Sequence, residues 1–157
     1  MDTSLVTPFV RSIQNVFATM LQLPLTARDP VTLRAPVSVD TVSGVVVLSG
    51  DIDGTVTLRM PRETAARVVA LFCGERVEES SAAFSDALAE LVNMVSGGAK
   101  AGLPAVRSIR VSCPEVRLGD TGAPALDAVI VPCDTDCGSF SLEVEAHRTA
   151  PTERAAA

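Results

Sequence analysis

Three polar side chains that could do chemistry recur along one stretch of the sequence: Asp86, Glu90 and Asn93. Their spacing of four and then three residues places them on one face of an α-helix. A solvated helix face usually mixes acidic and basic residues, which attract one another across a turn, yet no lysine or arginine lies between these three. An amide both donates and accepts hydrogen bonds and does not titrate. This face is an unusual choice for a helix that needs only to be soluble, and we interpret it as a candidate site.

An amphipathic helix over Ser80–Leu103 is predicted to carry these residues. Five apolar residues fall on its opposite face and would anchor it in a core: Phe84, Leu88, Leu91, Val92 and Val95. Gly97 and Gly98 follow, and a glycine in a helix interior costs about 1 kcal/mol relative to alanine. Two interpretations of this pair stay open. Either another backbone approaches closely there, or the helix ends near Gly98.

The sequence pattern Asp86-x3-Glu90-x2-Asn93, followed by the run from Gly97 to Lys100, resembles the signature of the CheC/CheX/FliY chemotaxis phosphatases. Pro114 stands near the position where that signature also has a proline. A glutamate and an asparagine at this spacing would carry little information alone. The order of the surrounding elements adds to the resemblance.

The resemblance extends over residues 4–146, where an opening helix, a hairpin, a second helix and closing strands follow in the family's order. The CheC branch carries a further Glu-x2-Asn in its opening helix. The equivalent register here begins with Ser12 and ends with Asn15, so the glutamate is missing. The resemblance therefore indicates one active-site motif, as in CheX. It also implies a homodimer formed through the sheets.

An activity is implied by this resemblance, namely hydrolysis of the phospho-aspartate of a CheY-type response regulator. Such an acyl phosphate already hydrolyses with help from the regulator's own Mg²⁺, so the phosphatase needs no metal or other cofactor of its own. It needs only a group that holds a water in line with the phosphorus. We expect Asn93 to position that water and Glu90 to pair with a cation of the regulator. Asp86, Gly97 and Gly98 are expected to contact this partner.

A second function of a different class remains open. The chain could be a CheX-like dimeric adaptor or binding module in a chemotaxis or two-component complex, without turnover. Loss of the phosphoryl group from a regulator, measured with and without the protein, separates the two hypotheses.

The length and net charge of the chain limit the possible fold classes and exclude several functions. With 157 residues, 47% of them hydrophobic, the chain is long enough for one globular domain with a core. A net charge of −6 argues against a nucleic-acid surface, which needs clustered lysine and arginine. No apolar run reaches the roughly 18 residues that cross a membrane, and no basic leader precedes the first apolar residues. We therefore expect a cytoplasmic protein with four free thiols and with neither nucleic acid nor membrane as a partner.

The predicted fold class is α+β. One domain over residues 1–148 would contain a mostly antiparallel sheet, with the long central helix and two further helices packed on it. Residues 149–157 are expected to form a flexible tail. The lone histidine, His147, lies at the end of the last predicted strand and is given no role.

The two further helices are predicted from their start and stop signals. The opening helix should begin at the N-cap Thr7, with Pro8 at its first position, and end near Leu23. Its packing face would consist of Phe9, Ile13, Val16, Phe17 and Met20. The other helix should open at Pro61 and end at the C-cap Gly74.

The sheet is predicted from alternating and β-branched stretches. These are an edge strand reached through the loop Thr26–Val39, a hairpin of Ser43–Leu48 and Thr55–Met60, and strands at Ile109–Leu118, Ala128–Val131 and Ser139–Ala146. Pro114 is expected at a strand edge or bulge. Asp51 and Asp53 are interpreted as turn formers, because the spacing of a calcium loop is missing. Cys133 and Cys137 are interpreted as flanking a turn, because their spacing does not fit a zinc site.

Overall fold

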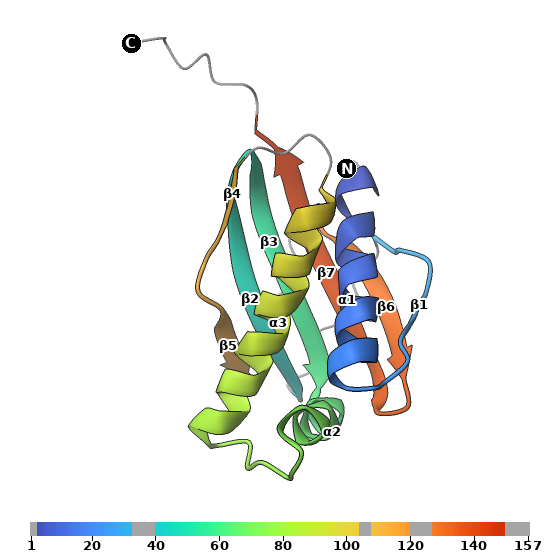
Figure 1. The fold of residues 1–157 in the computed structure, drawn as a ribbon, viewed down its shortest axis with the longest axis vertical. Helices are drawn as coiled ribbons and strands as arrows, with labels where there is room; N and C mark the ends of the chain where they lie inside the picture. The colour runs from blue at the N-terminus through green and yellow to red at the C-terminus, as the bar shows by residue number, and fades with distance from the viewer. Residues whose placement is uncertain (1–2, 33–39, 104–107, 120–126, 150–157) are drawn as a thin grey trace.

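One antiparallel sheet of seven strands carries three α-helices across the described residues, which are 3–32, 40–103, 108–119 and 127–149 of this computed structural model (Figure 1). The elements follow one another as η1 (Thr3–Leu5), α1 (Thr7–Met20), β1 (Thr26–Ala27), β2 (Thr41–Gly50), β3 (Ile52–Pro61), α2 (Arg62–Cys73), α3 (Ala82–Gly102), β4 (Ile109–Val111), β5 (Glu115–Leu118), β6 (Val129–Thr135) and β7 (Gly138–Arg148). In the sheet the strand order is β1-β6-β7-β3-β2-β4, and β5 also pairs with β2. Helices α1 and α3 lie side by side over the sheet, and α2 lies at one end of it. The predicted fold class is confirmed.

The core lies between the sheet and the helices. All five apolar residues predicted for the inner face of α3 are buried, and so are Phe9, Ile13 and Phe17 of α1. The Phe17 ring stacks on Phe140 of β7 with 5.4 Å between ring centroids. Burial of each large apolar side chain contributes roughly 1.5 to 3 kcal/mol to stability. The helical spacing of the sequence therefore identified the face that holds α3 in place.

Helix α1 begins one residue earlier than predicted. Val6, not Thr7, is its N-cap, and the Val6 carbonyl accepts hydrogen bonds from the N–H groups of Phe9 and Val10 at 3.0 and 3.2 Å. The prediction failed because Val6 already has helical dihedral angles and follows the 3-10 turn of η1, so no hydroxyl cap is needed. Met20 was also wrongly assigned to the core.

Met20 is 50% exposed because α1 ends there and the chain turns. Leu21 and Leu23, which follow the helix, are buried instead. The Leu23 N–H donates to the Phe17 carbonyl at 3.0 Å and holds this turn against the helix.

The hairpin of β2 and β3 is longer than predicted, and only Asp51 separates its strands. Asp51 is a turn residue, as predicted, and its carboxylate accepts from the Ser108 N–H at 2.8 Å. Asp53 lies within β3, so its assignment to the turn was wrong. The tight connection uses Gly50 at φ +113°, a conformation that favours glycine.

The predicted strand Ile109–Leu118 is divided into β4 and β5, which both pair with β2. Pro114 lies between them and has no N–H to donate to the ladder. Ser112 bridges the gap, because its N–H donates to the Val47 carbonyl at 2.9 Å and its hydroxyl accepts from the Val47 N–H at 2.8 Å. Pro114 thus lies at a strand edge, as expected.

Apart from the edge strand, the other predicted elements lie close to their expected positions. Helix α2 has Pro61 as its N-cap and Gly74, at φ +75°, as its C-cap. The edge strand β1 is misplaced in the prediction, because it lies where the loop was expected to begin and pairs there with β6. Residues 33–39 of the predicted loop lie outside the described residues.

Thr149, the first residue of the predicted tail, is held by the β2–β3 turn. Its N–H donates to the Asp51 carbonyl at 3.0 Å, and its hydroxyl donates to the Gly50 carbonyl at 2.9 Å. The remaining tail residues, 150–157, lie outside the described residues, and the boundary at 148 stays a prediction.

Candidate functional site on helix α3

Helix α3 starts at a side-chain cap and continues for 21 residues. Ser81 is the N-cap, and its hydroxyl accepts from the Phe84 N–H at 3.2 Å. The helix ends at Gly102, close to the predicted boundary. The interpretation that the helix ends near Gly98 is therefore wrong.

The sheet side of α3 lies close to β2 because Gly44 has no side chain there. A Cβ at Gly44 would lie 3.3 Å from Val92 Cγ1, and Gly44 itself is buried. Val92 and its neighbour Leu88 are buried against this strand. The inner face of α3 is thus fixed against the sheet, which holds its outer face in a defined direction.

Helix α1 fixes α3 from the side. The buried Ser12 hydroxyl donates to the Val95 carbonyl at 2.7 Å. This hydrogen bond joins α1 to α3 through two residues that are 83 positions apart in the sequence. A Cβ at Gly98 would collide with the Ser12 hydroxyl, and one at Gly102 would lie 3.4 Å from Pro8. Gly98 therefore permits close approach of another element of the same chain.

This close helix contact was not predicted from the sequence. The sequence feature that corresponds to this contact is a pair of small residues or prolines four positions apart on each helix. These pairs are Pro8 with Ser12 and Gly98 with Gly102. Such spacing places both members of each pair on one helix face. Only the pairing of α1 with α3 shows that the two faces meet.

The polar face of α3 points away from the sheet and from α1. The side chains of Asp86, Glu90 and Asn93 are exposed, and Gly97 is exposed one turn beyond Asn93. We call these four residues the outer stripe. Glu90 and Asn93 are separated by about 4.5 Å along the helix axis, given a rise of about 1.5 Å per residue. Among the described residues, none forms a hydrogen bond or ion pair with these three polar side chains.

The exposed amide and carboxylates can therefore bind a group brought by another molecule. The amide can hold a water by donating and accepting at once, and the carboxylates can pair with a cation. Their exposure and spacing agree with the prediction. Contact with a partner remains a prediction for Asp86, Gly97 and Gly98.

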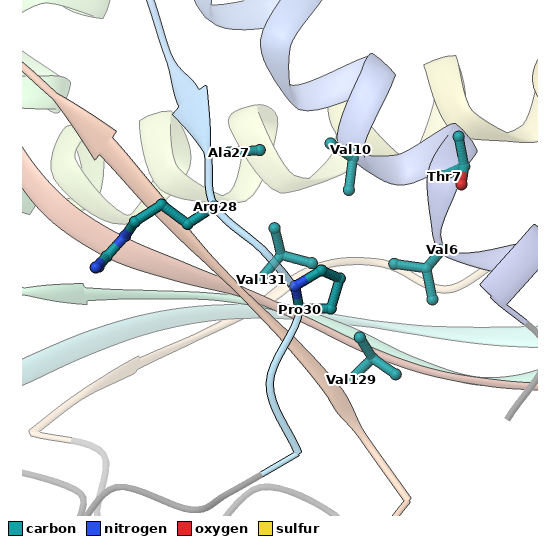
Figure 2. Close-up of a pocket in the computed structure, with 8 residues that line it drawn as sticks. All are labelled: Val6, Thr7, Val10, Ala27, Arg28, Pro30, Val129 and Val131. Carbon is teal, nitrogen blue, oxygen red and sulfur yellow. The ribbon is translucent and has the colours of Figure 1, made fainter.

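A pocket of about 240 Å³ lies elsewhere, between the start of α1, β1 and β6 (Figure 2). Its lining consists of Val6, Thr7, Val10, Ala27, Arg28, Pro30, Val129 and Val131. The Arg28 guanidinium is engaged by the Asp134 carboxylate at 3.0 Å. The outer stripe contributes no residue to this pocket, whose volume is below that of typical small-molecule sites.

The cysteines differ in exposure, since Cys73 and Cys113 are exposed whereas Cys133 and Cys137 are buried. All four are free. The predicted turn between two strands is confirmed, but it is shorter than expected: Cys137 lies in it, whereas Cys133 lies within β6 and pairs with Phe140. Burial raises the pKa of the Cys133 thiol to about 12 and also raises the pKa of Cys137. Within the described ranges, no three His, Cys, Asp or Glu residues are grouped as metal ligands would be. In the same ranges, no helix has the length and apolar character to cross a membrane.

Several solved structures share this fold. A chemotaxis protein CheX from Desulfovibrio desulfuricans matches with a TM-score of 0.76 and 24% identity, over 91% of this chain and 99% of that chain. A CheC-like superfamily protein from Shewanella sp. PV-4 matches with a TM-score of 0.78 and 24% identity, over 94% and 99%. CheX in a CheX–CheY–BeF3–Mg²⁺ complex from Borrelia burgdorferi matches with a TM-score of 0.73 and 20% identity, over 92% and 98%.

The chain thus folds into an α+β domain like those of these structures, and it presents an acid and an amide on its long helix. The sequence model of the family described as "Chemotaxis phosphatase CheX" matches residues 42–133, which include α3. The chain belongs to the CheX family. Among curated proteins, none matches the chain.

Proposed function

We propose that this protein accelerates the dephosphorylation of a phospho-aspartate on a CheY-type response regulator. The observation that carries the proposal is the exposure of Glu90 and Asn93, one turn apart, on a helix held by both the sheet and α1. Membership of the CheX family supports the same function.

Asn93 enters the regulator's active site and holds a water in line with the phosphorus. The amide suits this role because it accepts one hydrogen bond from the water, donates another to a neighbouring oxygen, and stays neutral at every working pH. Fixing one water contributes about 2 to 4 kcal/mol to lowering the barrier, or about 30- to 1,000-fold in rate. The regulator's Mg²⁺ stabilises the charge of the phosphoryl group, and this protein supplies no cofactor.

Glu90 pairs with a cation of the regulator beside the phosphoryl group and so orients Asn93. Asp86 lies one turn before Glu90 and adds negative charge to the same face. An acidic face also raises the rate of encounter with a basic rim. The Borrelia structure holds CheX together with CheY, BeF3 and Mg²⁺, which is the type of partner that we propose here.

The test follows loss of the phosphoryl group from the organism's CheY-type regulators, with and without this protein. Regulator fluorescence can be used, because this chain contains no tryptophan or tyrosine. We expect acceleration by the wild type, and a loss of about 30-fold or more in Asn93→Ala, with a smaller loss in Glu90→Ala. Binding of a regulator without any acceleration would contradict the phosphatase and favour a non-catalytic adaptor.

A further inference from the structure

The two adjacent glycines of α3 have different surroundings. Gly98 faces Ser12 of α1, where an added Cβ would collide with the hydroxyl, so a contact inside the chain explains this glycine. Gly97 has no such explanation. It is exposed, its φ is not in the left-handed region, and a Cβ built on it would meet no atom of the described residues within 4 Å.

A glycine at this position lowers helix stability without any gain inside the described structure. Position 97 lies five residues before the end of α3, where alanine would be preferred to glycine in a helix interior. An added methyl group would enter open space. The reason for a glycine at this position therefore lies outside the described part of the chain.

The direction of helical side chains indicates what that reason is. The Cα–Cβ bond of a helical residue tilts toward the N-terminus of the helix, and its side chain covers the turn before it. A side chain at position 97 would therefore lie over the turn of Asn93. Its absence leaves the surface beside the Asn93 amide open.

We propose that Gly97 is the point where the regulator's backbone or loop lies against α3 while the Asn93 amide occupies the phosphoryl site. This inference rests on the proposed function and adds a specificity-determining position to it. The partner is a regulator with a cationic group beside its phosphoryl site. Its cation meets the acidic half of the outer stripe at Asp86 and Glu90, and its surface then covers Gly97.

The experiment compares Gly97→Ala and Gly97→Leu with Ala83→Leu. Ala83 is also exposed on α3 but lies about 15 Å from Asn93 and about 21 Å from Gly97 along the axis, at about 1.5 Å per residue, so a leucine there adds the same bulk to this helix far from the amide. Two quantities are measured for each protein: the thermal midpoint of unfolding, and the affinity for CheY-type regulators loaded with beryllofluoride and Mg²⁺.

We expect Gly97→Ala to raise the thermal midpoint by about 2 to 4 °C, because the helix gains a better helix former. Gly97→Leu should keep a midpoint no lower than the wild type and bind the loaded regulator at least tenfold more weakly. Ala83→Leu should bind within twofold of the wild type. Only at position 97 should a larger side chain weaken binding of the loaded regulator while the thermal midpoint stays the same or rises.

Wild-type affinity in Gly97→Leu would overturn the inference, and so would a lower midpoint in Gly97→Ala, since the fold itself would then require the glycine. A wild type that binds the loaded regulator without accelerating dephosphorylation would refute the phosphatase activity. In that case the affinities of the wild type and of Gly97→Leu for the loaded regulator would still decide the role of Gly97. A wild type that binds none of the organism's CheY-type regulators would overturn both.

Discussion

Asn93 and Asn15 are exposed amides on neighbouring helices, but only one of them has an acidic residue three positions before it. On α1 that position is Ser12, which is buried and hydrogen-bonded to the Val95 carbonyl. A glutamate could not take its place without separating α1 from α3, because Gly98 lies against it. The packing of α1 on α3 therefore favours a small residue at position 12.

Asn15→Ala should leave the acceleration of regulator dephosphorylation within twofold of the wild type. Helix α1 contains no Asp or Glu that could orient the Asn15 amide, so we expect no second water-holding site there. The same phosphoryl-loss assay measures this, with Asn93→Ala as the comparison. A tenfold loss in Asn15→Ala would indicate a second active site on α1.

The exposure of single residues was largely predictable, whereas their packing partners were not. Helical spacing identified the inner and outer faces of α3, because an amphipathic helix has one way to bury its apolar side. The Ser12–Gly98 contact could not be predicted, since it depends on which helix lies beside α3. The different roles of Gly97 and Gly98 followed only from that contact.

At the scale of elements, the Ser12–Gly98 contact sets the distance between α1 and α3. Gly98→Ala should destabilise the protein by up to about 2 kcal/mol, because the collision of the new methyl group with the Ser12 hydroxyl costs about 1 to 3 kcal/mol and the better helix former offsets about 1 kcal/mol of it. In a Ser12→Ala background the same change should cost less, since the hydroxyl is gone. Urea unfolding of the four proteins of this double-mutant cycle measures the coupling. Strictly additive costs would show that the two residues do not constrain each other.

The errors in element boundaries have separate physical causes. The hairpin was predicted too short because Gly50 allows a one-residue connection that propensity alone does not indicate. One strand became two because Pro114 interrupts the ladder along β2. The start of α1 was misplaced because the preceding 3-10 turn continues into the helix without a hydroxyl cap.

Thiol reactivity tests the arrangement of the β6–β7 turn and its neighbours. Burial raises the pKa values of Cys133 and Cys137, so both remain protonated at pH 8 and are shielded from reagents. Cys73 and Cys113 are exposed. Iodoacetamide at pH 8 should therefore modify two cysteines in the native protein and all four in urea, as counted by mass spectrometry. Rapid modification of Cys133 in the native state would contradict the placement of β6 in the core.

At the scale of the whole molecule, the sheet has one short edge strand, β1, and an interrupted edge formed by β4 and β5. We propose that two copies associate through their sheets, as the family resemblance implies. Sedimentation equilibrium at micromolar concentration should give a mass near twice the 16.3 kDa of one chain. Only monomer at these concentrations would contradict the homodimer.

The central claim is that Asn93 supplies catalysis and not only affinity. The most direct measurement is the rate of phosphoryl loss from the regulator at saturating phosphatase, where differences in binding no longer contribute. Asn93→Ala should bind the beryllofluoride-loaded regulator within about threefold of the wild type, while the rate at saturation falls at least 30-fold toward the regulator's own rate. A saturating rate equal to that of the wild type would contradict the account.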